Sequence, residues 1–344
     1  MFFKENKTLF SHQYAHIKIV MHSIKELQQI IDTAVKEIHY PTTPNELYEP
    51  IAYLMALGGK RLRPALVLMA TDLFGGDIED AKAPALAIEM FHNFTLMHDD
   101  IMDNAPIRRG QPTVHEKWSN SVAILSGDVM FVKAYRLMIQ VKPEILTAVL
   151  EVFNKTAIEV CEGQQIDMNF ELRKEVSIEE YLEMIRLKTA VLLGGALKIG
   201  ALIGDASAQN ANLLYQFGEN LGLAFQLQDD ILDVYGDPEK FGKQVGGDIM
   251  SNKKTFLLIK ALELAQGDDL INLTAWINKK DFVPEEKVEA VKTLYNRLNI
   301  RTLSEEVMQQ YAKLALDAFE KIDTPIENKK TLLSFAEMLV EREN

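Results

Sequence analysis

The stretch LMHDDIMDNAPIRRG, residues 96–110, places a DDxxD motif directly after an apolar segment. A second stretch, FQLQDDILDVYGD, residues 225–237, repeats the motif further along the chain. The aspartates of the two motifs are Asp99, Asp100, Asp103, Asp229, Asp230 and Asp233. On a helix, positions i and i+4 point in directions about 40° apart and lie roughly 6 Å apart along the axis. Asp99 and Asp103 are therefore expected to project together, as is the corresponding pair of the second motif.

Such a pair of carboxylates is costly on a helix, because like charges at this spacing repel and Asp is a poor helix former. The apolar residues before each motif predict that the motif lies against a hydrophobic core. A cation that bridges the two carboxylates would remove the electrostatic repulsion between them. A few oxygen ligands that leave room for water and phosphate favour Mg²⁺ over zinc or calcium. For one motif, a solvated helix end is the better interpretation. Two copies, each followed by a basic loop, favour a metal site.

The helical pattern extends beyond the motifs. Between Pro143 and Pro238 the chain has no proline, which suits long helices, whereas the eight prolines from Pro41 to Pro143 are expected to break the preceding part. Apolar residues in the proline-free span recur at helical spacing, as in Ile158, Cys161, Gln165 and Met168, or Leu213, Phe217, Leu221, Ala224 and Phe225. No stretch shows sustained strand alternation. We therefore expect an all-α protein.

Small residues gather between Gly194 and Gly204, which predicts two closely packed helices. Residues 104–113 and 235–252 are rich in glycine and proline and are expected to be loops, each directly after a DDxxD motif. The chain shows no short repeat and no low-complexity linker. We expect a single catalytic domain over residues 21–344. Residues 1–20 are expected to be an extension that is either disordered or upstream of the true start.

Composition narrows the choice of partners. The chain has 344 residues and a net charge of −13, which argues against nucleic acid and anionic membranes as partners. Its single cysteine, Cys161, cannot form an intrachain disulfide and is expected to be a small buried hydrophobe in a reducing compartment. We find no apolar run long enough to span a bilayer and no signal-peptide pattern at the N-terminus. The expected location is the cytoplasm.

Basic residues accompany the acidic motifs. GGKRLRP, residues 58–64, places three cations after two glycines, and Pro64 suits the first position of a helix, whose N-terminus would favour an anion. Further polar or basic candidates are Arg108, Arg109, Lys188, Thr189, Lys243 and Lys253. Any one of these cations, considered alone, is better interpreted as a solvent-exposed charge than as a phosphate ligand. Their grouping around two acidic motifs favours phosphate binding.

Two polar residues are expected to share the acidic faces. His92 stands seven residues before Asp99, and Gln226 stands seven residues before Asp233. Side chains seven residues apart on a helix point in directions within about 20° of each other. Taken alone, His92 would be a core histidine.

Taken together and in this order, the motifs resemble those of the trans-isoprenyl diphosphate synthases, the polyprenyl synthetase family. The matching segments are GGKRLRP, DDIMDNAPIRRG, EGQQIDM, RLKTA, FQLQDDILD and GKQVGGDI. The resemblance covers nearly the whole chain from about Met21. It implies the isoprenoid synthase fold, a single bundle of about ten long helices around a deep central cavity, usually paired as a homodimer.

The resemblance also implies roles for individual residues. Asp99, Asp103 and Asp229 would bind Mg²⁺, three ions per active site, and Asp233 is counted as a fourth metal ligand, directly or through water. Asp100 would lie nearby, and Asp230 completes the catalytic set. The allylic diphosphate would be held by Arg108, Lys188 and Lys243. Isopentenyl diphosphate would be held by Lys60, Arg63, His92 and Arg109. Thr189 and Gln226 would line the reaction centre, Lys253 would close it, and Asp167 would orient a basic residue or water.

The implied reaction is head-to-tail condensation of isopentenyl diphosphate with an allylic diphosphate. A class I terpene cyclase is one rival, but it would usually have a single DDxxD and no second diphosphate site. A non-catalytic subunit of a heteromeric synthase is another, but such subunits typically lose aspartates that this chain retains. A longer-chain polyprenyl diphosphate synthase remains an alternative for the product.

Product length is expected to depend on the helix of the first motif. One turn rises about 5.4 Å, close to one extended isoprene unit, so Phe94 and Thr95 are candidates for the cavity floor. In the resembled family, aromatic residues at both positions tend to stop growth at farnesyl length. Here only Phe94 is aromatic, which favours geranylgeranyl over farnesyl diphosphate. The alternative is a deeper floor, at Phe91 or on a neighbouring helix.

Overall fold

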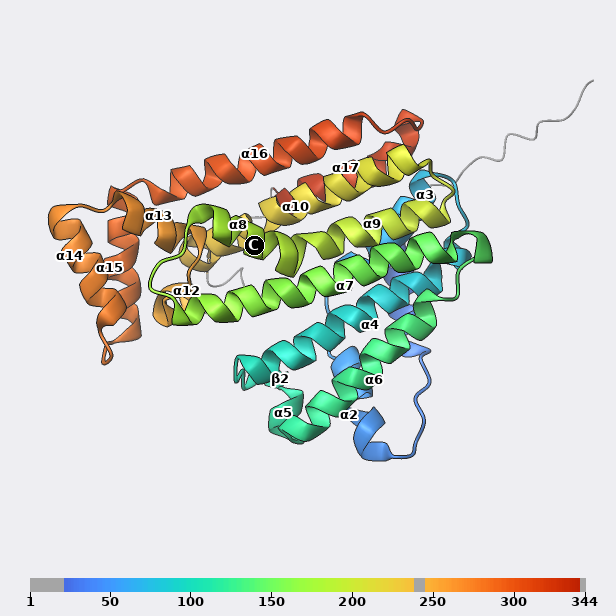
Figure 1. Ribbon diagram of the computed structural model, residues 1–344, viewed down its shortest axis with the longest axis horizontal. Helices are drawn as coiled ribbons and strands as arrows, with labels where there is room; N and C mark the ends of the chain where they lie inside the picture. Colours follow the sequence, from blue (N-terminus) through green and yellow to red (C-terminus); the bar gives the residue numbers. More distant parts are fainter. Residues whose placement is uncertain (1–21, 238–244, 341–344) are drawn as a thin grey trace, which may run out of the picture.

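The computed structural model describes residues 22–237 and 245–340, and these are almost entirely helical (Figure 1). The first half contains α1 (Ile24–Lys36), α2 (Asn45–Ala56), α3 (Leu62–Leu73), α4 (Ile78–Met102), β1 (Ile107–Arg108), β2 (Gln111–Pro112), α5 (Val114–Lys117), α6 (Asn120–Met138) and α7 (Pro143–Leu172). The second half contains α8 (Ile178–Ile185), η1 (Arg186–Ala190), α9 (Val191–Ile203), α10 (Ala208–Tyr235), α12 (Gly247–Ser251), α13 (Phe256–Leu264), α14 (Gly267–Asn278), α15 (Pro284–Arg297), α16 (Ile300–Glu320) and α17 (Ile326–Val340). The expected all-α fold is confirmed.

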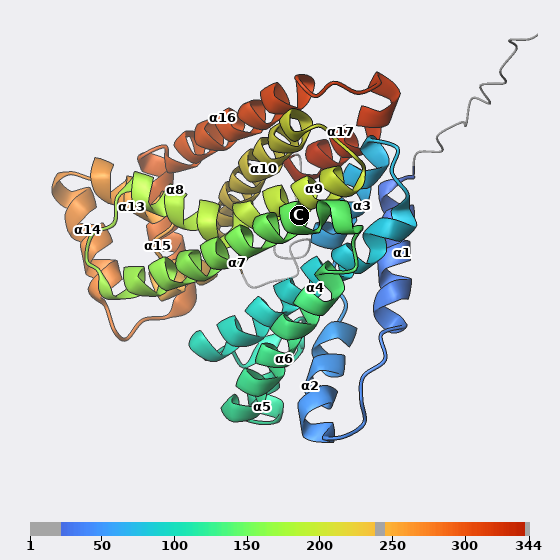
Figure 2. The same cartoon turned by 45° about the vertical axis from the view of Figure 1, so that its right-hand side comes forward.

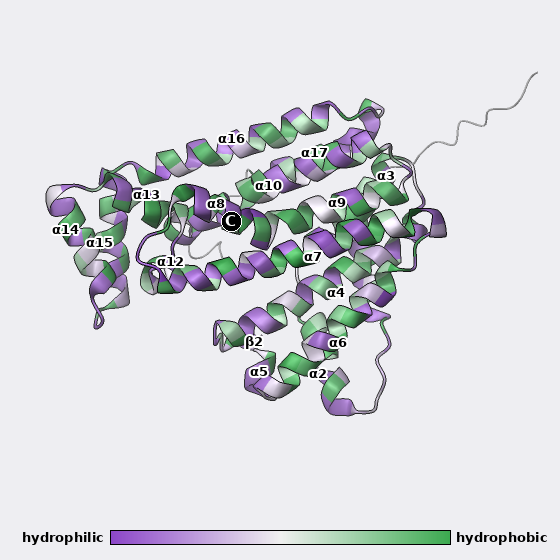
Figure 3. Ribbon diagram, viewed as in Figure 1, coloured by the Kyte–Doolittle hydropathy of each residue, from purple (hydrophilic) through white to green (hydrophobic). Residues whose placement is uncertain are grey.

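The longest helices form the centre of the bundle. Helix α9 packs against α3, α7 and α10, while α6 covers α4 and α16 covers α10 (Figures 1 and 2). Outer helices such as α16 alternate hydrophobic and hydrophilic residues, because one face packs on the core and the other meets water (Figure 3). One buried cluster joins the helices around α3, α4 and α9, and a second joins the C-terminal half of α10 to α13, α15 and α16. No described helix is both long and apolar enough to cross a membrane.

The glycines of α9 allow the close packing that their spacing predicts. A Cβ atom on Gly200 would lie 2.1 Å from the carbonyl oxygen of Val67 in α3. A Cβ on Gly194 would lie 2.9 Å from the carbonyl oxygen of Tyr215 in α10. Helix α9 therefore fits between α3 and α10 only because these positions carry no side chain.

Three prolines lie inside helices, two that we expected to break helices and one, Pro64, that we expected at the first helical position. Pro50 lies in α2 and Pro84 in α4, while Pro64 is the third residue of α3, which begins at Leu62 rather than at the proline. All three lie within the first seven residues of their helices. The fold tolerates them because a missing N–H so close to a helix start removes few intrahelical hydrogen bonds.

The two expected loops contain short regular elements. In residues 104–113, β1 and β2 form an antiparallel hairpin, with Arg109 and Gly110 at its turn in left-handed conformations, φ 52° and 74°. In residues 235–252, α10 extends to Tyr235 and α12 occupies the last part. Lys243, an expected ligand of the allylic diphosphate, lies outside the described residues, as does the expected N-terminal extension.

The expectation of a buried Cys161 is wrong, because its side chain is exposed. The face of α7 that we took as apolar, including Ile158 and Cys161, does not meet the core. Helix α7 packs through another face, with Val149 and Phe153 buried. In α10 the predicted face is right at its centre, where Phe217, Leu221 and Ala224 are buried.

Candidate active site

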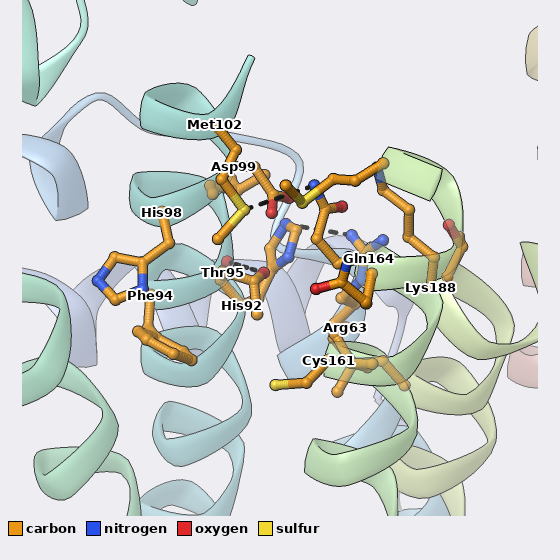
Figure 4. Close-up of a pocket in the computed structure, with 16 residues that line it drawn as sticks. Arg63, His92, Phe94, Thr95, His98, Asp99, Met102, Cys161, Gln164 and Lys188 are labelled. Atoms are coloured by element: carbon orange, nitrogen blue, oxygen red, sulfur yellow. Dashed lines mark hydrogen bonds between the residues drawn. The ribbon is translucent and has the colours of Figure 1, made fainter. Parts of the chain in front are cut away.

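A cavity of about 370 Å³ lies between α4 and α7, with η1 forming a third wall (Figure 4). Asp99 and Lys188 face it from opposite sides, and Arg63 and His92 lie between them. The rest of the lining is mostly apolar or uncharged: Phe94, Thr95, Leu96, His98, Met102, Val160, Cys161, Gln164, Gln165, Met168, Thr189 and Leu192. The cavity thus has a charged end and an apolar body.

The first motif lies at the C-terminal end of α4. Asp103 is the C-cap residue of the helix, and its backbone N–H donates to the carbonyl oxygen of Asp99 at 2.8 Å. The pKa of Asp99 is raised to about 6, chiefly by burial; the charge of Lys188 opposes this rise, and the charge of Asp103 adds to it. Burial also raises the pKa of Asp103. The two carboxylates therefore share a face, as predicted, and carry the expected electrostatic cost.

Asp100 lies on a different face of α4. It is only 2% exposed and accepts three hydrogen bonds, at 2.7–2.9 Å, from Nε and Nη2 of Arg108. Arg108 belongs to β1, so this bidentate pair fixes the hairpin against the end of α4. The middle aspartate of the first motif thus positions a predicted diphosphate ligand.

The second motif is connected to η1 and α8 through a chain of side-chain contacts. The hydroxyl of Thr189 donates to Oε1 of Gln226 at 3.3 Å, and Nε2 of Gln226 donates to Asp230 at 3.1 Å. Asp230 also accepts a hydrogen bond from the hydroxyl of Tyr181. Burial raises the pKa of Asp230 to about 7. Asp230 thus corresponds to Asp100, since both are buried middle residues that orient neighbours.

Asp233, the last residue of the second motif, fixes the start of α12. Its carboxylate accepts the backbone N–H of Asp248 at 2.9 Å, and its carbonyl oxygen accepts that of Gly246 at 2.6 Å. Lys253 follows α12. Burial lowers the pKa of Lys253, but nearby carboxylates outweigh burial and raise it. These carboxylates come from α12, from both motifs and from α7: Asp248, Asp230, Asp103 and Asp167.

Lys188 extends from η1, a single π-helical turn. Its Nζ donates to Oδ2 of Asp167 at 2.6 Å, so Asp167 orients a basic residue, as one of our two expectations stated. A Cβ on Gly163 of α7 would lie 2.3 Å from the backbone nitrogen of Lys188. The RLKTA segment can therefore approach α7 only at a glycine, and π-helical turns are frequent at functional sites.

The predicted ligands of the second diphosphate form a separate basic group. Nη1 of Arg63 lies 3.3 Å from Nε2 of His92. Burial lowers the pKa of His92 well below its ordinary value, so its ring is neutral and can accept this hydrogen bond. Arg109 donates to the carbonyl oxygen of Gly58, and Lys60 belongs to the same loop. The structure thus brings the GGKRLRP segment, α4 and the hairpin together.

Several residues of this region were missed or misjudged from the sequence. Arg61 is turned into the protein, where it pairs with Glu89 of α4. Tyr181 and Asp248 lie far along the chain from the aspartates that they contact. Only Glu89 had a detectable signal, because an acidic residue three positions before His92 interrupts the apolar stretch of residues 83–91.

A metal ion bound by the described side chains would need further ligands. Within residues 22–237 and 245–340, no three His, Cys, Asp or Glu side chains are grouped so that they could hold an ion. The Asp99–Asp103 pair still fits Mg²⁺, because its oxygens are partly removed from water and their charges add. Mg²⁺ usually keeps waters and binds through one or two carboxylates plus substrate phosphates.

Comparison with known proteins agrees with this geometry. The polyprenyl synthetase family model matches residues 44–298. The chain belongs to the polyprenyl synthetase family. It is 40% identical to the geranylgeranyl diphosphate synthase of Methanosarcina mazei, over 93% of this chain and 97% of that protein. It is 35% identical to the geranylfarnesyl diphosphate synthase of Natronomonas pharaonis, over 93% and 97%.

A crystal structure of a geranylgeranyl pyrophosphate synthase superimposes with a TM-score of 0.89 at 43% identity, covering 94% of this chain and all of the other. This likeness confirms the isoprenoid synthase fold that the resemblance implies. Together with the family match, it makes this polyprenyl synthetase an enzyme, a prenyltransferase, and the expectation of a catalytic rather than a purely structural helical protein is confirmed.

Proposed function

We propose that this polyprenyl synthetase condenses isopentenyl diphosphate head-to-tail with allylic diphosphates, in a Mg²⁺-dependent reaction, and that geranylgeranyl diphosphate is its main product. The observation that carries the proposal is one cavity with an apolar body and a charged end, where a second basic group, Arg63 with His92, lies between Asp99 and Lys188. A terpene cyclase would have no use for that second basic group. A non-catalytic subunit would not need all six aspartates.

Each basic group has its own task in this proposal. Bound at Asp99, Asp103, Asp229 and Asp233, three Mg²⁺ ions would supply Lewis-acid stabilisation of the departing diphosphate. Lys188, Arg108, Lys243 and Lys253 neutralise the same leaving group. Lys60, Arg63, His92 and Arg109 hold isopentenyl diphosphate so that its double bond faces the allylic carbon.

The remaining residues protect and orient the reacting carbon. Thr189 lines the cavity and is held by Gln226, so its oxygen keeps a constant place beside Lys188. The apolar walls exclude water, which would otherwise quench an allylic cation. The proton lost after bond formation passes to the departing diphosphate, because no described side chain in the cavity is an obvious dedicated base.

The floor of the cavity supports the proposed twenty-carbon product. Phe94 lines the cavity and stacks on Phe131 of α6, with ring centroids 5.0 Å apart and planes 16° apart. Phe91 is fully buried, and the centroid of its ring lies 5.7 Å from that of Phe94. Thr95 donates its hydroxyl to the carbonyl oxygen of His92 at 2.8 Å and adds little bulk. An aromatic wall thus closes one side of the cavity only.

Phe94→Ala should lengthen the product by at least one isoprene unit, because the cavity would open toward Phe131. Thr95→Phe should shorten it by narrowing the other side. The double variant Phe94→Ala/Phe131→Ala should extend the product beyond the single variant. Phe319→Leu in α16, a buried aromatic that does not line the cavity, is the control. Products are sized by chromatography. An unchanged product distribution in all three cavity variants would show that other residues determine product length.

One incubation tests the function itself. Purified protein is given Mg²⁺, labelled isopentenyl diphosphate and allylic primers of five, ten and fifteen carbons, and the products are separated by length. We expect twenty-carbon product from each primer. A predominant product of fifteen carbons, or one longer than twenty carbons, would contradict the proposed product, and no product at all would contradict the activity.

We also propose a cytoplasmic homodimer. Helix α6 exposes Leu125 and Val132, and its C-terminal capping residue Ile139 is also exposed; the three repeat every seven residues and lie on one stripe. Exposed apolar stripes of this kind mark interaction surfaces. Sedimentation equilibrium should give twice the chain mass, and Val132→Glu should shift it toward the monomer. A monomeric wild type would overturn the proposal.

A further inference from the structure

Four arginines lie close enough to His92 for their charges to act on it, namely Arg61, Arg63, Arg108 and Arg109, and Nη1 of Arg63 lies 3.3 Å from its Nε2. Burial lowers the pKa of His92 most, and the charges of all four arginines lower it further. Such a group repels itself when no anion lies among the guanidinium groups. Asp100 compensates Arg108, as described above, which leaves three arginines to be balanced.

Glu89 of α4 is a buried carboxylate that contacts one of these three, Arg61, and stands three residues before His92, which contacts Arg63. Its side chain is 4% exposed, and it accepts hydrogen bonds from Nη1 of Arg61 and from Nδ2 of Asn93, the latter at 2.9 Å. Arg61 is 3% exposed and donates also to the carbonyl oxygen of Met55 at 2.8 Å and to Asp32 at 3.2 Å. Glu89 does not line the cavity and takes no part in the reaction proposed above.

The influence of Glu89 extends past its direct partner. Burial lowers the pKa of both Arg63 and Arg109, and in each case the charge of Glu89 is the largest effect that opposes burial. Arg61 acts on Arg109 in the opposite sense. One buried carboxylate therefore offsets part of the charge on three arginines, of which it touches one.

We propose that Glu89 is an internal counter-ion of the isopentenyl diphosphate site, which holds the arginines together until the substrate's diphosphate takes over part of that charge balance. This inference rests on the proposed function, because it needs a diphosphate among Arg63, Arg109 and Lys60. It assigns Glu89 a positioning role with a cost: the carboxylate stabilises the free enzyme and weakens the attraction of the site for its anion.

The two effects have opposite signs and can be separated. Glu89→Gln keeps the shape of the side chain and removes its charge, so the free enzyme should lose stability. The positive charge of the arginines is less compensated in this variant, so a bound diphosphate would be attracted more strongly. Diphosphate would therefore stabilise the variant more than it stabilises the wild type. Because a ligand that stabilises a folded protein more also binds it more tightly, the dissociation constant should fall in parallel.

The experiment measures melting temperatures of the full chain by scanning calorimetry, with inorganic diphosphate titrated from zero to millimolar at constant ionic strength. EDTA is present throughout, so that binding does not depend on the metal-binding aspartates. Without diphosphate, Glu89→Gln should melt several degrees below the wild type. With saturating diphosphate, at least half of this deficit should disappear, and isothermal titration should give a dissociation constant severalfold lower.

Asp32→Asn is the matched control. It also removes a carboxylate that accepts from Arg61, but this carboxylate is 48% exposed and screened by water. Its diphosphate-induced gain in melting temperature should equal that of the wild type, so a larger gain would belong to Glu89 alone.

Three outcomes decide the matter. If diphosphate fails to raise the melting temperature of the wild type, the proposed basic site is wrong, and the inference falls with it. If the wild type gains and Glu89→Gln gains equally or less, Glu89 is only a structural partner of Arg61. If Glu89→Gln cannot be purified folded, it is refolded from urea with and without diphosphate, and failure of diphosphate to improve recovery overturns the proposal.

Discussion

Asp99→Ala and Asp229→Ala should each lower kcat by at least about 10³-fold, because each removes a charge that the transition state needs and water cannot replace in a closed cavity. Asp99 faces the cavity with a pKa raised to about 6, chiefly by burial, so its charge is held at a cost that Lys188 and Arg108 offset only in part and a bound cation would offset further. Asp229 helps to raise the pKa of Arg63 against the effect of burial, which places its charge near the second basic group. Steady-state kinetics with both substrates saturating measures the loss.

Removing the metal should have the same effect on turnover as removing its aspartate ligands. EDTA should abolish condensation, and added Mg²⁺ should restore it fully. Asp317→Ala on the exposed face of α16 is the control, since it removes one negative charge far from the motifs and should leave kcat unchanged. Near-normal turnover in both motif variants would rule out the metal assignment.

Motif spacing predicted the face shared by Asp99 and Asp103 because helix geometry alone determines which residues project together. It could not distinguish the outer aspartates from the middle ones. Asp100 and Asp230 are buried and bonded to Arg108 and Tyr181, and these partners depend on a hairpin and on a helix elsewhere in the chain. The same limit hid the pairing of Arg61 with Glu89. A run of three cations looks alike in sequence whether each faces a ligand or the core.

Local patterns failed where tertiary packing decides. The apolar spacing around Cys161 on α7 was consistent with a core face, yet α7 meets its neighbours through Phe153 and through Gly163, where η1 approaches. Proline positions misled for a related reason, because Pro84 lies near the start of a helix stabilised by packing along 25 residues. The span without proline was a sounder guide, since it depends on what α7, α9 and α10 lack rather than on what they touch.

Lys188→Ala should lower kcat by about 10²–10³-fold with little change in the KM of isopentenyl diphosphate, because the lysine acts on the leaving group of the allylic partner. Its ammonium lies 2.6 Å from Asp167 and faces the cavity opposite Asp99. Asp167→Asn keeps the lysine and removes only its charged partner, so its loss of kcat should be smaller. Single-turnover kinetics, with enzyme in excess over the allylic substrate, isolates the chemical step from product release.

Lys60→Ala provides the contrast that makes this prediction specific. Lys60 belongs to the loop that Arg109 contacts, whereas Lys188 extends from η1, so the loss of Lys60 should raise the KM of isopentenyl diphosphate with a much smaller effect on kcat. The two lysines carry the same charge, and only their positions distinguish the expected results. If Lys188→Ala raised the KM of isopentenyl diphosphate and Lys60→Ala left it unchanged, the division of the cations between the two diphosphates would be wrong.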